Sequence, residues 1–96
     1  MESQVRVRVV ISGRVQGVLF RQSARAKALE LGVLGWAHNL LDGSVEIVVE
    51  GEKENIEKFI EWCKKGPSFA KVENVEVQYQ EYKGEWKDFD VREFGF

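Results

Sequence analysis

The segment from Gly13 to Arg21, Gly-Arg-Val-Gln-Gly-Val-Leu-Phe-Arg, constrains the fold most strongly, because it joins a strand pattern to a helix pattern. Before it, valine and isoleucine alternate with arginines over residues 5–11, which is typical of a strand buried on one face. After it, apolar residues recur at helical spacing as far as Leu31, and Gly32 stands where a helix is commonly capped. Backbone N–H groups in such a connection belong to neither element and can converge on an anion.

Arg21 lies in the first turn of the expected helix, where a cation faces the positive end of the helix dipole. An exposed cation at this position costs about 0.3–1 kcal/mol. An oxyanion held between Arg21 and the loop amides would reverse the sign of that effect, and the guanidinium fork suits two phosphate oxygens. Gly17 allows the loop to fold tightly. The segment therefore predicts an anion-binding loop.

The remaining chain carries three more strand patterns, a second helix and a short terminal strand. These lie at residues 34–41, 45–50 and 72–79 for the strands, 56–63 for the helix, which stops at Gly66-Pro67, and Phe89 with Val91 for the last strand beyond a polar loop at 81–88. The order strand, helix, strand, strand, helix, strand is that of the split βαββαβ or ferredoxin-like fold. We expect an α+β sandwich over residues 1–96, one domain with two helices on one face of an antiparallel sheet.

This topology predicts which parts of the chain meet. The strands at 5–11 and 34–41 run parallel with the third strand between them, so their carboxyl ends lie at the same sheet edge. Asn39 stands at that end of the second strand, and its amide offers both a donor and an acceptor. We therefore expect Asn39 beside the loop that precedes Arg21.

Composition limits the partners of the chain. Its formal net charge of −2 gives no general attraction for nucleic acid or for an anionic membrane. No run approaches the ~20 apolar residues needed to cross a bilayer, and the N-terminus does not resemble a signal peptide. We expect a soluble, cytoplasmic monomer with no nucleic-acid or membrane partner.

Single cysteine and histidine residues give no metal-ligand set, so we expect neither a metal nor another cofactor. Cys63 is expected to pack as a small apolar residue and His38 to lie on the surface of its strand. Four charged residues are expected as cross-strand charges on the open face of the sheet, of little individual value: Arg6, Arg8, Glu46 and Glu50.

The segment from Gly13 to Arg21 resembles the signature of the acylphosphatase family, and Gly35-Trp36-Ala37-His38-Asn39 through Asp42-Gly43-Ser44-Val45-Glu46 resembles its second block. Chain length, the order of elements and the Gly66-Pro67 break are also similar to that family. The resemblance implies hydrolysis of the carboxyl–phosphate bond of a small acyl phosphate to a carboxylate and inorganic phosphate, without metal.

Carried onto this chain, the resemblance implies that Arg21 and the loop amides bind the phosphoryl group and that Asn39 orients the attacking water, whose proton passes to the substrate phosphate. The amides are those of Val15, Gln16, Gly17, Val18, Leu19 and Phe20. Ala37 and His38 stand where the family is expected to carry a bulkier valine and a basic residue, a difference that bears on substrate preference.

Other functions fit the residues less well. A P-loop nucleotide enzyme is excluded because no Gly-Lys-Ser/Thr follows the loop. An RNA-recognition module stacks bases on sheet aromatics, and the strands at 5–11 and 45–49 contain none. Arg21 alone could be a solvated helix-end residue, and Asn39 alone a turn residue. The serious alternative is a non-catalytic phosphate- or small-ligand-binding regulatory domain of ferredoxin-like fold, which would bind phosphate without turnover.

Overall fold

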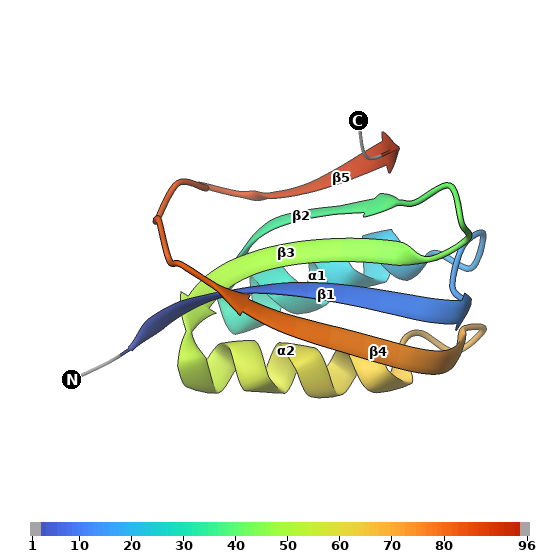
Figure 1. The fold of residues 1–96 in the computed structure, drawn as a ribbon, viewed down its shortest axis with the longest axis horizontal. Helices are drawn as coiled ribbons and strands as arrows, with labels where there is room; N and C mark the ends of the chain where they lie inside the picture. The colour runs from blue at the N-terminus through green and yellow to red at the C-terminus, as the bar shows by residue number, and fades with distance from the viewer. Residues whose placement is uncertain (1–2, 95–96) are drawn as a thin grey trace.

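A computed structural model describes residues 3–94 as seven elements in the order expected from the sequence (Figure 1). They are β1 (Gln4–Arg14), α1 (Phe20–Leu31), β2 (Leu34–Asn39), β3 (Val45–Glu52), α2 (Lys53–Lys65), β4 (Lys71–Gln80) and β5 (Phe89–Phe94). The second strand ends at Asn39, two residues before its expected end, because residues 40–44 form the turn to β3. Within residues 3–94, neither helix has the length and apolar character needed to span a membrane.

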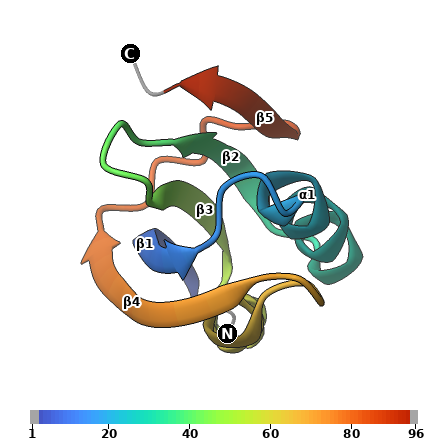
Figure 2. The ribbon, with the colours of Figure 1, turned by 90° about the vertical axis from the view of Figure 1, so that its right-hand side faces the viewer.

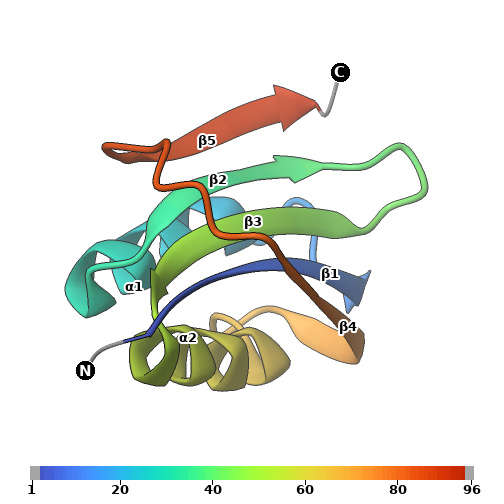
Figure 3. The same ribbon diagram turned by 60° about the vertical axis from the view of Figure 1, so that its left-hand side comes forward.

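The five strands form one sheet in the order β4-β1-β3-β2-β5, with β1, β3 and β2 in its centre. The first four strands pair antiparallel, as expected, whereas β5 pairs parallel to β2 and makes the sheet mixed. The reason is the connection between β4 and β5. β4 ends where β2 begins, and residues 81–88 cross the sheet face that carries no helix before β5 starts (Figure 3). A strand entered from that end runs parallel to β2.

Both helices cover one face of the sheet, and the core lies between the two layers (Figure 2). The strands contribute valine and isoleucine at alternate positions, while α1 contributes two alanines that let it approach closely. Fully buried examples are Val7, Val9, Ile11, Ala24, Ala28, Ile47, Val49, Ile56 and Phe59. Cys63 is also fully buried, and burial raises the pKa of its thiol. This confirms its expected role as an apolar core residue.

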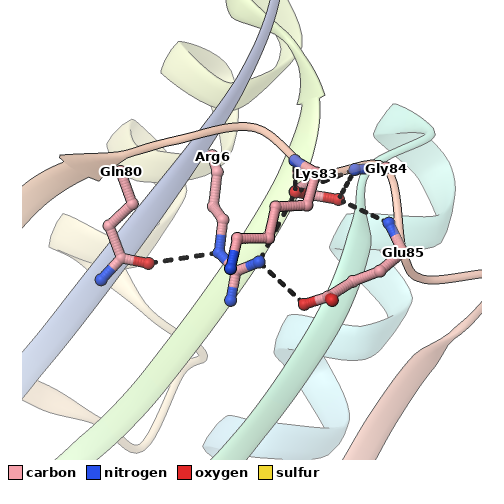
Figure 4. A network of polar contacts seen from close by, with 6 residues as sticks. Arg6, Gln80, Lys83, Gly84 and Glu85 are labelled. Atoms are coloured by element: carbon pink, nitrogen blue, oxygen red, sulfur yellow. Dashed lines mark hydrogen bonds and ion pairs between the residues drawn. The ribbon is translucent and has the colours of Figure 1, made fainter.

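The segment of residues 81–88, here called the crossing segment, is fastened to the sheet through Glu50 (Figure 4). The Glu50 carboxylate accepts hydrogen bonds from the backbone amides of Lys83 at 2.7 Å, Gly84 at 3.1 Å and Glu85 at 3.3 Å. Arg6 lies 3.7 Å from the same carboxylate and 2.8 Å from that of Glu85. The expected cross-strand pairing of Glu50 with Arg6 is confirmed. Glu50 is only 5% exposed, however, so the expectation that it faces solvent on the open side of the sheet is wrong. The crossing segment covers it.

Glu50→Ala should lower the free energy of unfolding by about 1–3 kcal/mol, because it leaves the amides of the crossing segment without their acceptor. Urea unfolding measures the change. Glu76→Ala, which removes an exposed glutamate from β4, is the matched control and should stay within about 0.5 kcal/mol of the parent. Equal stabilities of the two variants would show that the crossing segment is held by something else.

Candidate active site

The connection between β1 and α1 has an unusual backbone. Gly13 has φ +120°, and a Cβ there would lie 2.2 Å from the carbonyl oxygen of Lys71, so only glycine fits where β1 passes β4. Gly17 follows in the left-handed region with φ +74°. Leu19, the residue before α1, also adopts the left-handed conformation, with φ +63°. A leucine rarely does so, and backbone strain of this kind is concentrated at functional sites.

This loop leaves its amides available. Within residues 3–94, no backbone N–H from Gln16 to Phe20 donates a well-formed hydrogen bond to another residue. Four of the five amides belong to the loop itself, and the fifth opens α1. Successive free N–H groups at a helix start are the arrangement that binds phosphate in many proteins. The backbone therefore leaves these amides free for a ligand, and the anion-binding role expected from the sequence stays a prediction.

Arg21 is the second residue of α1, half-buried, and its Nη1 donates a hydrogen bond to the carbonyl oxygen of Arg92 on β5. One helical turn later, Arg25 donates from Nε to the carbonyl oxygen of Phe89 at 3.0 Å. Both arginines are therefore tied to the main chain of β5. The guanidinium of Arg21 has five N–H donors, so several remain for a ligand beside the loop amides. The role of β5 in holding Arg21 was not predicted from the sequence.

Asn39 is the last residue of β2, and the register of the sheet places it near the loop between β1 and α1. Ile11 near the end of β1 and Asn39 both lie opposite Val45, the first residue of β3. Figure 2 looks onto this end of the sheet, with the β1–α1 loop in blue and the β2–β3 turn in green. The expected meeting of the two strand ends is confirmed. Asn39 Oδ1 is buried and has no hydrogen-bond partner among the described residues, which leaves an acceptor for a ligand.

The side chain of Gln16 joins the loop to the β2–β3 turn. Its Nε2 donates to the carbonyl oxygens of Leu40 and Ser44, each at 2.8 Å. The turn is itself well ordered, because the Ser44 hydroxyl and amide both donate to Asp42 Oδ1 and hold the pKa of Asp42 below its ordinary value. Sequence reasoning gave Gln16 only a backbone role. The signal for a side-chain role is that Gln16 is a polar residue among the apolar residues of this loop.

His38 lies on the opposite sheet face from Asn39, since neighbouring strand residues point to opposite faces. It is only 7% exposed, so the expected surface position is wrong. Its Nε2–H donates to Glu46 Oε1 at 2.5 Å, and its ring lies 4.4 Å from that of Trp36 between centroids. His38 is therefore packed against the Trp36 ring and the Glu46 carboxylate.

Glu46 is the acceptor of the His38 hydrogen bond. Burial alone raises the pKa of the Glu46 carboxyl, but hydrogen bonds from His38 and Arg8 outweigh burial and hold this pKa below its ordinary value. On the face away from the loop, Glu46 thus accepts from both Arg8 and His38, while His38 Nδ1 is buried without a hydrogen-bond partner among the described residues. His38 does not join the candidate site.

The candidate site thus combines free backbone amides, one guanidinium and one side-chain amide at a single end of the sheet. In the part of the chain that the structure describes, no three histidine, cysteine or carboxylate side chains gather in a way that could hold a metal ion. Donors of this kind suit the oxygens of a phosphoryl group, and the free Asn39 acceptor suits a bound water.

Comparison with known proteins matches the same segments. The acylphosphatase family model matches residues 7–91, which include the loop, Arg21 and Asn39. A curated acylphosphatase of Pelotomaculum thermopropionicum is 51% identical over 89 residues, covering 93% of this chain and 97% of the relative. One of Roseiflexus is 50% identical over 91 residues, covering 95% of this chain and 98% of the relative.

Solved structures agree in fold. The structure of an acylphosphatase from Coxiella burnetii superposes with a TM-score of 0.88 at 43% identity, covering 93% of each chain. That of an acylphosphatase from Bacillus subtilis superposes with a TM-score of 0.88 at 33% identity, covering 92% of this chain and 98% of that one. With half of its residues shared with curated relatives over nearly its whole length, the chain belongs to the acylphosphatase family of hydrolases.

Proposed function

We propose that this enzyme binds the phosphoryl group of an acyl phosphate with Arg21 and the backbone amides of residues 15–20, and that Asn39 orients the attacking water. Acyl phosphate hydrolysis is the reaction of the family. The observation that carries the assignment is the set of unpartnered amides beside Arg21, at the same sheet end as the unpartnered Oδ1 of Asn39. Neither the loop amides nor Asn39 Oδ1 has a hydrogen-bond partner among the described residues. A phosphoryl group can accept from the amides, and a water can donate to Oδ1.

The proposed reaction needs positioning and charge stabilisation more than covalent chemistry. Asn39 accepts a hydrogen bond from the water, whose oxygen forms a bond to phosphorus as the bond from phosphorus to the acyl oxygen breaks. The electron pair of the broken bond leaves with the carboxylate. The second water proton passes to a phosphoryl oxygen, so the products are a carboxylate and dihydrogen phosphate. Arg21 and the loop amides offset the charge that builds on the phosphoryl oxygens.

Hydrolysis of benzoyl phosphate by the purified protein tests this function. An enzyme releases benzoate and inorganic phosphate in equal amounts over many turnovers. The alternative, a regulatory domain of the same fold, binds inorganic phosphate at the loop and leaves benzoyl phosphate at its uncatalysed rate of decay. Following benzoate release and phosphate binding in the same preparation separates the two.

Turnover should be independent of divalent metal, because the proposed site uses a guanidinium and backbone amides where other phosphoryl-transfer enzymes use cations. Dialysis against EDTA should leave kcat for benzoyl phosphate unchanged, and magnesium added afterwards should not raise it. Loss of turnover on chelation, with recovery on adding magnesium, would contradict the proposed roles of Arg21 and the loop.

We also propose that residues 1–96 act as one domain and as a monomer. One hydrophobic core joins residues of both helices and of all three central strands, which supports a single cooperative unit. A single urea transition reported alike by tryptophan fluorescence and circular dichroism is the expected result. Sedimentation equilibrium should give the mass of one chain.

A further inference from the structure

We propose that Gln16 is a positioning residue, whose side chain sets the place of Asn39 relative to the phosphate loop. The inference rests on the proposed function, because it concerns the distance between the water-holding and phosphate-holding parts of that site. The loop and the β2–β3 turn come from separate connections of the chain. Gln16 bridges them directly, with both protons of its amide shared between the carbonyl oxygens of Leu40 and Ser44 at 2.8 Å each.

The side chain of Asn39 has no other described protein group to hold it. Its Oδ1 is buried without a partner, and none of the described residues hydrogen-bonds to its side-chain NH2 group. The position of the Asn39 side-chain amide therefore depends on the backbone of Asn39 itself. On one side this backbone is fixed by pairing with Val45 of β3, and on the other by Leu40, the next residue, whose carbonyl Gln16 binds.

The two hydrogen bonds of Gln16 are not needed to close the turn. The Ser44 carbonyl oxygen already accepts from the Leu40 amide at 2.9 Å, and the Leu40 carbonyl oxygen from the Gly43 amide at 3.2 Å. Ser44 is further tied to Asp42. Removing the side-chain amide of Gln16 therefore leaves a folded turn whose carbonyl oxygens still accept hydrogen bonds. It removes the link between that turn and the loop. What changes is the relative position of Asn39 and the bound phosphate.

Gln16→Met keeps the length of the side chain and removes its donors. We expect kcat for benzoyl phosphate to fall between about 10-fold and 10²-fold, because a displacement of about 1 Å between reacting groups has an effect of this size. Competitive inhibition by inorganic phosphate should change less than about twofold, since Arg21 and the loop amides are retained. Gln78→Met is the matched control, an exposed glutamine of β4 outside the site, and should leave both constants unchanged.

Gln16→Lys tests the bridge by rescue, because an ammonium group has three donors and can reach two carbonyl oxygens. Its kcat should exceed that of Gln16→Met. Equal kcat values for the parent and Gln16→Met would overturn the inference, as would a phosphate inhibition constant that rises in step with the loss of kcat. The latter result makes Gln16 a phosphate-binding residue.

A double-mutant cycle shows whether Gln16 acts through Asn39. If it does, Gln16→Met should lower kcat in the parent and have no further effect in an Asn39→Ala background. Independent, multiplicative losses would overturn the inference while leaving the role of Asn39 intact. An Asn39→Ala variant with parental kcat would instead refute the proposed function, so the two failures are distinguishable.

The side-chain amide resonances of Asn39 in ¹⁵N-labelled protein give a readout that needs no turnover. With inorganic phosphate as the only ligand, they should shift in Gln16→Met and stay in place in Gln78→Met. Unchanged Asn39 resonances in Gln16→Met would overturn the inference even if kcat fell.

Discussion

Arg21→Ala should lower kcat/KM for benzoyl phosphate by about 10²–10³-fold, because it removes a preorganised donor to the charge that develops on the phosphoryl oxygens. Inhibition by inorganic phosphate should weaken as well, since Arg21 is proposed to bind the phosphoryl group in the ground state too. Arg21→Lys should recover little, because an ammonium keeps the charge and loses the two-pronged donor geometry. Steady-state kinetics with phosphate as a competitive inhibitor measures all three effects.

Arg25 provides the matched control for this experiment. It lies one turn further along α1 and binds the β5 carbonyl of Phe89, so Arg25→Ala also removes a cation and a hydrogen bond to β5. It leaves the loop and Arg21 in place, and we expect phosphate inhibition close to that of the parent. If Arg21→Ala and Arg25→Ala weaken phosphate inhibition equally, the effect comes from β5 or from net charge, and Arg21 is not the phosphate ligand.

Asn39→Ala should lower kcat by about 10²-fold while leaving phosphate inhibition nearly unchanged. The variant loses the group that fixes the water in line with the breaking bond, and it keeps the groups that recognise the phosphoryl oxygens. It should fold normally, because the truncated Oδ1 has no hydrogen-bond partner among the described residues and its removal leaves no donor unsatisfied there. Steady-state kinetics and thermal unfolding of the same preparation check both parts.

Two further variants sharpen this test. Asn39→Asp keeps an acceptor for water but adds a negative charge that repels the anionic substrate, so it should raise the phosphate inhibition constant where Asn39→Ala does not. Asn74→Ala, at an exposed position of β4, is the control and should match the parent. A loss of phosphate inhibition in Asn39→Ala in proportion to its loss of kcat would make Asn39 a phosphate ligand, and unfolding of that variant would make its role structural.

Local patterns predicted the fold well because each element carries its own signal. The alternation of β1, the stripe of α2 and the Asp42-Gly43 turn depend on residues close together in the sequence. The order of these elements then fixed the neighbours of β1 and β2 through the handedness of the crossover. The meeting of the loop and Asn39 followed from this topology alone.

The errors arise where distant segments cover one another. Glu50 and His38 lie on the sheet face without helices, and their sequence context is that of exposed strand residues. Glu50 is covered by the crossing segment, whose amides it binds, and His38 packs against the Trp36 ring and the Glu46 carboxylate. The parallel direction of β5 has the same origin. No periodicity in residues 81–94 encodes how the chain crosses the sheet, because that path is set by groups far away in the sequence.

The attachment of Arg21 to Arg92 on β5 divides the site into parts of unequal local stability. β5 is an edge strand with a single strand neighbour, whereas the loop and Asn39 depend on β1 and β2, which are paired on both sides. Edge strands open at lower free energy than central ones. When β5 frays, Arg21 loses its anchor and Asn39 loses one of its two strand neighbours, whereas Asn39 keeps its pairing with Val45 of β3 and the loop stays joined to β1. Under the proposed role of Arg21, its guanidinium can move while the loop amides and the pairing of β2 with β3 stay in place, so release of phosphate need not disturb the central sheet.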